Sequence, residues 1–235
     1  MFQAQLDLEV VKQPDDVTCG PTCLYSVYDY YKHTIGLQDV INEVSMLEEG
    51  GTLAPSLGIH ALKSGFQATI YNFNLNIFDP TWFSLPRDEL IGKLNTQASI
   101  RTSKRLIAAS LIYAEYLRLG GNVAFEDLTP QLVSRFLQRG IPVITGLSAT
   151  YLYRSPREIP ETNKPDDMNG YPSGHFVVVT GIDMVTRQVA IADPYQPNPL
   201  GSRGSYKIDI ERLVCAILLG VMTYDANLLI VTRKE

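Results

Sequence analysis

Four residues that together could carry out acyl transfer occur along the chain in the segments QPDDVTCGPTCL, GYPSGHFVVVTGID and VAIADPY. They are Gln13, Cys19, His175 and Asp193. A thiolate attacks a carbonyl carbon, an imidazole moves the proton, and a carboxylate orients that imidazole. An amide N–H stabilises the oxyanion that forms. The set therefore predicts a hydrolase with a cysteine nucleophile.

Cys19 is expected at the amino-terminal end of a helix. A helix amino terminus and a nearby imidazolium lower the pKa of a thiol from about 8.5 into the working range. Pro21 favours a first helical turn, and Gly20 lets a substrate approach the backbone closely, so Gly20 is a predicted substrate contact. The apolar spacing that follows predicts a helix to about residue 33: Leu24, Val27, Tyr28 and Tyr31.

The other three residues are expected to converge on Cys19. A Pro-Asp-Asp turn after Gln13 would fold its amide toward the thiol as an oxyanion donor. His175 opens a strand, HFVVVTGID, and Asp193 ends a second one, QVAIAD, with residues 184–187 closing a hairpin between them. A turn centred near Thr186 would place Asp193 opposite Val178. His175 and Asp193 would then lie at the same end of the hairpin.

Some candidate residues have structural interpretations. Cys23 and Cys215 fit small buried hydrophobic residues, and His33 and His60 fit structural histidines. Cys19 and Cys23 have no second Cys or His pair at zinc-binding distance. We therefore expect no metal and no cofactor.

These motifs resemble the papain-like cysteine peptidases, and most closely the double-glycine leader peptidases that trim bacteriocin precursors. By that resemblance Gln13 is the oxyanion donor, Cys19 the nucleophile, His175 the general base and Asp193 its orienting partner. The resemblance lies in the two ends of the chain, leaves out a helix-like segment at about 78–128, and implies a papain-like fold. Because the family's usual fusion to a membrane exporter with an ATPase is not seen in this sequence, we expect a stand-alone domain.

Composition indicates a globular enzyme, since 45% of the residues are hydrophobic and 19% are charged. A net charge of −5 and the lack of a basic stripe argue against nucleic-acid binding. The amino terminus has no signal-peptide pattern, and no apolar run reaches the roughly eighteen residues that span a membrane. Three cysteines cannot all pair, which favours a reducing compartment. We expect a cytoplasmic protein with no membrane partner; the oligomeric state stays open.

The order of elements predicts an α+β fold in a single domain, 1–235. Residues 1–140 form a mainly helical lobe with the nucleophile, with one short extended piece, FQATIYNF. Its helices are expected at about 19–33, 37–47, 55–64, 87–95, 103–118 and 129–138. Residues 141–235 form a mainly β lobe with His175 and Asp193, in antiparallel strands with a short helix after Asp209. The site would be the cleft between the lobes.

Residues 148–174 show no helix or strand pattern. Loops of this length are often functional or disordered. Because the stretch ends at His175, it is expected to border the cleft as a lid or substrate wall. Tyr151, Tyr153, Tyr171 and Gly174 are the predicted substrate contacts.

The sequence thus predicts a thiol-dependent hydrolase that cleaves a peptide or amide bond through an acyl-enzyme. Two alternatives stay open. One is acyl transfer or transpeptidation on the same triad, in which an amine replaces water. The other is a non-catalytic peptide-binding module of the same fold.

Overall fold

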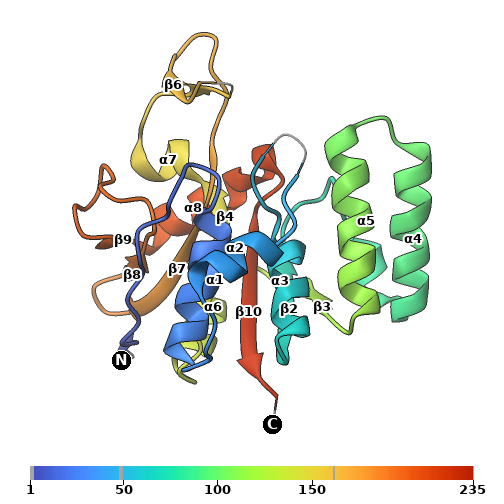
Figure 1. The fold of residues 1–235 in the computed structure, drawn as a ribbon, viewed down its shortest axis with the longest axis horizontal. Coiled ribbons are helices and arrows are strands. Elements are labelled where there is room, and N and C mark those ends of the chain that lie inside the picture. Colours follow the sequence, from blue (N-terminus) through green and yellow to red (C-terminus); the bar gives the residue numbers. More distant parts are fainter. Residues whose placement is uncertain (1–2, 48–49, 161, 235) are drawn as a thin grey trace.

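A central mixed sheet organises the protein (Figure 1), seen in a computed structural model that describes residues 3–47, 50–160 and 162–234. Seven of its eight strands run in the order β3-β2-β10-β4-β7-β8-β9, and the eighth, β1, pairs with β7. Only β2 and β3 pair in parallel among these described strands. The strands are β1 (Gln3–Gln5), β2 (Phe66–Asn72), β3 (Asn122–Ala124), β4 (Val143–Ser148), β7 (Gly174–Asp183), β8 (Gln188–Ala192), β9 (Ser205–Asp209) and β10 (Asn227–Arg233).

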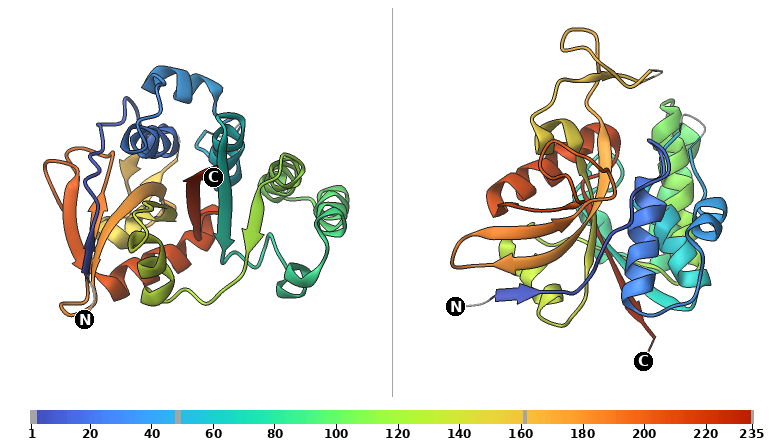
Figure 2. Two further views of the ribbon diagram at one scale, coloured as in Figure 1. Left: turned by 90° about the horizontal axis from the view of Figure 1, so that it is seen from below. Right: turned by 60° about the vertical axis from the view of Figure 1, so that its left-hand side comes forward.

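Helices cover both faces of the sheet (Figure 2). One face carries α1 (Cys19–Tyr30), α2 (Leu37–Glu43) and α3 (Ala54–Lys63), and the other carries α6 (Pro130–Leu137), α7 (Ala149–Tyr153) and α8 (Ile210–Leu219). Beyond α3, α4 (Arg87–Ile100) and α5 (Lys104–Arg118) pack against each other. Short 3-10 turns are η1 (Pro80–Ser84) and η2 (Gly220–Thr223).

Alternation along β7 explains why both faces are covered. Successive strand residues point to opposite faces of a sheet. Phe176 and Val178 lie in the core beneath α1 and α3, whereas Val177 and Val179 lie in the core beneath α6 and α8. Because both residue sets are apolar, the strand is buried on both sides, as its continuous hydrophobic run predicts. This places the start of β7 between two packed layers.

The α+β class and most predicted elements are confirmed, with shifts at their ends. The first helix begins at Cys19 with Thr18 as its N-cap and ends at Tyr30 rather than near residue 33. The helix predicted at 87–95 continues to Ile100. The short extended piece predicted at FQATIYNF contains the strand β2, which lies between β3 and β10 in the central sheet. The first 140 residues thus contribute strands as well as helices.

The segment 148–174 has more regular structure than its sequence predicts. It contains α7 and a small hairpin, β5 (Glu158–Ile159) with β6 (Lys164–Pro165), which projects from the body of the protein (Figure 1). These elements are too short to give a periodic pattern, which is why the sequence did not reveal them. In the part of the chain that the structure describes, no helix is long and apolar enough to cross a membrane.

Candidate active site

Cys19 is the first residue of α1 and is partly exposed. The first N–H groups of a helix have no partners within it, so their partial positive charge faces the thiol. Gly20 is buried, and a Cβ there would lie 3.4 Å from Leu57 and Phe176. Gly20 therefore serves the packing of α1 on the sheet, and only its backbone is available for the predicted substrate contact.

His175 lies at the start of β7 and is 7% exposed. Its Nε2 donates to Asp193 Oδ1 at 2.8 Å, which leaves Nδ1 for a hydrogen bond with Cys19. Burial alone would lower the pKa of His175, but the charges of Asp193 and Cys19 and the hydrogen bonds to both raise that pKa to about 10. The imidazole is therefore suited to exist as an imidazolium beside a thiolate.

Asp193 is fully buried directly after β8 and accepts four hydrogen bonds. Oδ1 accepts from His175 Nε2 and, at 2.9 Å, from the backbone N–H of Tyr195. Oδ2 accepts from the hydroxyls of Tyr153 at 2.7 Å and Tyr206 at 2.6 Å. Burial alone would raise the pKa of Asp193, but the imidazolium and these hydrogen bonds hold it below its usual value. The carboxylate is thus held in one charged orientation.

Tyr153 has a different position from the substrate wall that the sequence suggests. Its hydroxyl is engaged with Asp193, and burial raises the pKa of this phenol, so it remains a proton donor. The hydroxyl of Tyr206 on β9 also donates to Asp193, and burial raises the pKa of that phenol as well. The ring of Tyr195 packs edge-on against His175. Neither Tyr195 nor Tyr206 is among the site residues predicted from the sequence. The VAIADPY motif and the pairing of β8 with β9 are the signals that locate them.

A β-bulge corrects the predicted hairpin register. Val178 pairs with Ala192, but Gly181 pairs with Ala190, so Thr180 is an extra residue in β7. Continued beyond Ala192, this register places Asp193 opposite Val177 rather than Val178. Because a one-residue shift moves a side chain to the other face of a strand, the bulge turns Asp193 toward the face of His175.

Gln13 is buried near the end of this hairpin. Its backbone N–H donates to Pro194 O at 2.9 Å, and its side-chain Nε2 donates to Asp15 O at 2.7 Å. One amide hydrogen is therefore used within the turn that leads to Cys19, and no acceptor for the second is found among the described residues. Oε1 has no hydrogen-bond partner among the described residues.

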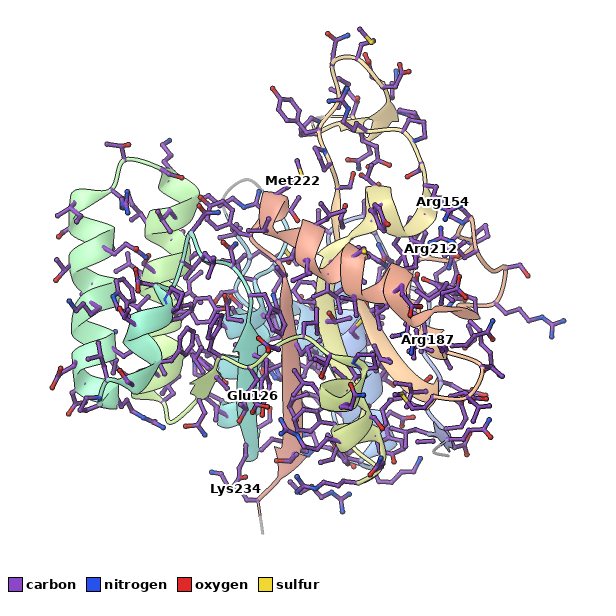
Figure 3. All side chains as sticks on the ribbon, turned by 180° about the vertical axis from the view of Figure 1, so that it is seen from behind. Glu126, Arg154, Arg187, Arg212, Met222 and Lys234 are labelled. Carbon is purple, nitrogen blue, oxygen red and sulfur yellow. The ribbon has the colours of Figure 1, made fainter. Side chains whose placement is uncertain are left out.

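The remaining predicted substrate contacts lie on or beside the projecting segment. Tyr171 is 66% exposed and pairs with Glu158. Tyr151 lines a cavity of about 300 Å³ together with Arg154 and Met222. Figure 3 labels Arg154 and Met222 on the face of the sheet that carries α7 and α8. Asn163 Nδ2 donates to Asp16 Oδ2 at 2.9 Å, which connects the projecting hairpin to the turn before Cys19.

The other cysteines and histidines divide between confirmed and corrected interpretations. Cys23 is buried and donates to Phe176 O, and His60 is buried and hydrogen-bonded to Tyr28 at 2.8 Å, as structural residues should be. His33 packs edge-on against Tyr28. Cys215 is exposed on α8, so its assignment as a buried hydrophobic residue is wrong. The apolar run around Cys215 lies in α8, the helix that the sequence predicts after Asp209, and Cys215 is on the exposed side of that helix.

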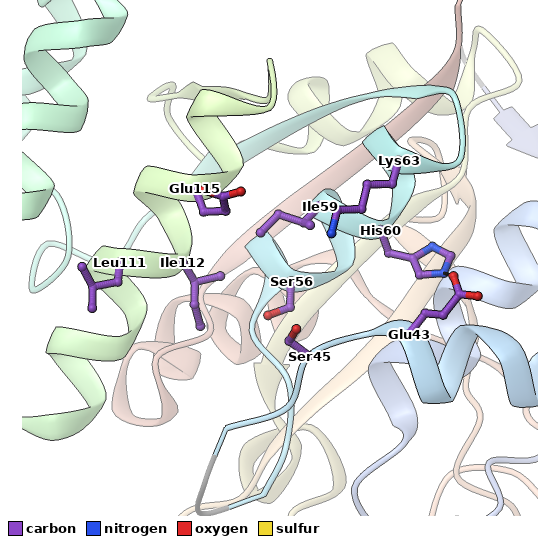
Figure 4. A pocket seen from close by; sticks show the side chains of 9 residues that line it. All are labelled: Glu43, Ser45, Ser56, Ile59, His60, Lys63, Leu111, Ile112 and Glu115. Carbon is purple, nitrogen blue, oxygen red and sulfur yellow. Dashed lines mark ion pairs between the residues drawn. The ribbon is translucent and has the colours of Figure 1, made fainter.

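A cavity of about 460 Å³ lies between α3 and α5 (Figure 4). None of the predicted site residues lines it; its lining residues are Glu43, Ser45, Ser56, Ile59, His60, Lys63, Leu111, Ile112 and Glu115. Within residues 3–47, 50–160 and 162–234, no group of three or more His, Cys, Asp or Glu side chains is arranged to hold a metal ion.

Comparison with known proteins gives one family. The model of the peptidase C39-like family matches residues 4–213, a range that includes the central helical segment. No curated protein sequence matches the chain.

Three solved structures are similar, each at 15% sequence identity. A double-glycine-motif protease from an AMS/PCAT transporter, in complex with the leader peptide, has a TM-score of 0.47 with 100% of both chains covered. The peptidase domain of Streptococcus ComA, a bifunctional ABC transporter of a quorum-sensing pathway, has a TM-score of 0.45 with 97% of this chain and 99% of that chain covered. Xylellain, a cysteine protease from Xylella fastidiosa, has a TM-score of 0.46 with 99% of this chain and 86% of that chain covered.

The family match covers most of the chain and agrees with the family that the sequence motifs resemble. The protein belongs to the peptidase C39-like family and is a papain-like, cysteine-peptidase-like hydrolase.

Proposed function

We propose that the protein hydrolyses a peptide or related amide bond through an acyl-enzyme on Cys19. The observation that supports this most strongly is the 2.8 Å hydrogen bond from His175 to Asp193, in an imidazole whose pKa is also raised by Cys19 at the start of α1. Membership of a peptidase family supports a peptide as the substrate class. A reducing compartment, such as the cytoplasm, would keep the nucleophile as a thiol.

The reaction would begin with proton transfer from Cys19 Sγ to His175 Nδ1. The thiolate attacks the carbonyl carbon, and the carbonyl oxygen becomes an oxyanion held by the Cys19 backbone N–H and the second Nε2 hydrogen of Gln13. His175 then donates its proton to the leaving nitrogen as the C–N bond breaks, which leaves a thioester. Water, deprotonated by His175, attacks the thioester and releases a carboxylic acid and the thiol.

The projecting segment would form one wall of the substrate path. Its contact from Asn163 to Asp16 spans the approach to the turn before Cys19, and its Tyr171 is exposed. Aromatic side chains provide large contact areas with few rotatable bonds. We assign Tyr171 and the backbone beside Gly174 as the substrate contacts of this wall.

Digestion of a proteome-derived peptide library in ¹⁸O-labelled water tests this function. Wild-type protein should produce new carboxyl termini that carry ¹⁸O, whereas Cys19→Ala should produce none. Cys215→Ser is the matched control, because it removes an exposed thiol on α8 that is not part of the triad, and it should cleave like the wild type. Products joined to an added amine instead of ¹⁸O would identify a transferase. Equal cleavage by wild type and Cys19→Ala would refute the proposal.

A further inference from the structure

A second carboxylate, Asp225, is buried beside the triad at the point where η2 leads into β10. Three glycines from different elements surround it. A Cβ at Gly146 on β4 would lie 2.8 Å from Asp225 Oδ1, and one at Gly220 would lie 3.2 Å from Asp225 Cβ. A Cβ at Gly174 would overlap Asp225 Oδ2. The carboxylate thus occupies space that only glycines at these positions leave free.

Asp225 has few partners for a buried carboxylate. The Thr223 hydroxyl donates to Oδ2 at 2.7 Å, and this is its one side-chain hydrogen bond within the described residues. Arg105 of α5 lies nearby, but its guanidinium donates to Thr223 O at 2.9 Å. Burial raises the pKa of Asp225 to about 7, against the lowering effects of Thr223, Arg105 and His175.

The position of Asp225 relates directly to His175. Gly174 immediately precedes His175 in β7, and its missing side chain is what allows the carboxylate to approach this part of the strand. The charged groups that act on Asp225 are His175 from β7 and Arg105 from α5; Thr223 of η2 and Asn227 of β10 are neutral. His175 is therefore the member of the triad to which Asp225 couples.

We propose that Asp225 is a positioning residue of the active site: its ionised carboxylate stabilises the imidazolium of His175 and so increases the charged, reactive form of the Cys19–His175 pair. This inference rests on the proposed function. Asp193 fixes the orientation of the ring, and Asp225, packed against Gly174 next to His175 in β7, adds a titratable charge within electrostatic reach of it. Because Asp225 ionises near neutral pH, the reactivity of Cys19 acquires a second pH dependence.

The test is the rate of Cys19 alkylation by iodoacetamide between pH 4 and 9, in a Cys215→Ser background and read by peptide mass spectrometry. Unsubstituted Asp225 should give two inflections, one of them near pH 7. Asp225→Asn keeps the size of the side chain and should remove that inflection, with an alkylation rate at pH 8 about tenfold lower, the order of effect of one nearby charge. Thr223→Val removes a hydrogen bond that favours the ionised form, so the inflection should move to higher pH.

The outcomes separate this inference from the proposed function. If Cys19 is activated but Asp225→Asn gives the same profile as its background, the positioning role is wrong and the hydrolase proposal stands. If Cys19 reacts with a midpoint near 8.5, an unactivated thiol, both are wrong. If Asp225→Asn does not fold by circular dichroism, Thr223→Val decides, and an unmoved inflection overturns the inference.

Discussion

Two buried carboxylates lie beside His175, and their surroundings drive them to opposite electrostatic states. Asp193 accepts four hydrogen bonds, two of them from tyrosine hydroxyls, and its pKa is lowered. Asp225 accepts one side-chain hydrogen bond, and its pKa is raised to about 7. Burial acts in the same direction on both, since it penalises the charged form. At Asp193 the charge of the His175 imidazolium and the hydrogen-bond donors together outweigh burial, whereas at Asp225 burial prevails over Thr223, Arg105 and His175.

The difference shows how one imidazole can have two kinds of carboxylate neighbour. A fully bonded carboxylate stays charged across the working pH range and fixes the orientation of the ring. A poorly bonded one titrates in that range and can modulate the same imidazole. We therefore expect substitutions of Asp193 and Asp225 to differ in the size of their effect on Cys19 and in the sign of their effect on folding stability.

The largest effect should come from Asp193→Ala. Turnover should fall by about a hundred- to ten-thousandfold, because an imidazole without its carboxylate loses its orientation and the stabilisation of its charged form. Asp183→Ala is the matched control at the far end of the hairpin, where the carboxylate only caps the turn through Val185 and Thr186. The rate of Cys19 alkylation at pH 6 is measured in both variants, and it should fall in Asp193→Ala but not in Asp183→Ala. A greater loss in Asp183→Ala would mean that the wrong carboxylate is assigned.

Gln13→Ala should separate oxyanion binding from the carboxylate network. The backbone bond from Gln13 to Pro194 remains in this variant, so Asp193 keeps its position. Turnover should fall by about ten- to a thousandfold, the range for removal of one oxyanion donor. Alkylation of Cys19, which forms no oxyanion, should change little. A protein that instead melts at a much lower temperature would show that Gln13 is structural.

Tyr153→Phe and Tyr206→Phe each leave Asp193 with fewer hydrogen bonds and so bring its surroundings closer to those of Asp225. Each removes one hydrogen bond to a buried charge, which should reduce the free energy of unfolding by about 1.5–3 kcal/mol. The pKa of Asp193 should rise in each, and most in the double variant, so the acid limb of the Cys19 alkylation profile should move upward. Tyr171→Phe is the control, since Tyr171 is exposed and does not contact Asp193. An acid limb that stays in place would contradict the account of how Asp193 is kept charged.

Asp225→Asn should have the smallest effect on the free energy of unfolding, and it should stabilise the folded state where the other substitutions destabilise it. The raised pKa of Asp225 means that the folded state binds a proton more tightly than the unfolded state between about pH 4 and 7, so stability falls as pH rises through this window. The variant should therefore be more stable at pH 8 by about 1–2 kcal/mol and little changed at pH 4. The contribution of His175 to folding stability, by contrast, is fully present below about pH 6.5 and is lost as the pH rises through about 10. Urea unfolding at both pH values checks the sign.

Much of the site could be predicted from the sequence because its signals are local. Cys19 precedes Gly20 and Pro21 at a helix start, and His175 opens a long apolar strand, so periodicity and turn residues locate both. The same patterns predicted most helices and the strands after residue 141. The α+β class followed from their order.

The rest depends on contacts between distant parts of the chain. The bulge at Thr180 has no clear signature in the sequence, yet it sets the face on which Asp193 lies. Tyr206 reaches Asp193 only because β9 pairs with β8, and Asp225 fits only because glycines of β4 and β7 leave space. Cys215 was misjudged because a helix that is apolar over most of its length does not show from its sequence which residues face solvent.

The most direct test of the central claim is the pH dependence of alkylation at the three cysteines in the wild-type protein. Iodoacetamide labelling from pH 4 to 9, read by peptide mass spectrometry, should show Cys19 reacting fastest, with a midpoint well below the value of about 8.5 for an ordinary thiol. Exposed Cys215 should label more slowly than Cys19, and buried Cys23 should label least, since burial and the charges of Cys19 and Asp193 raise the pKa of Cys23. A Cys19 midpoint near 8.5, or equal labelling of Cys19 and Cys23, would contradict the account.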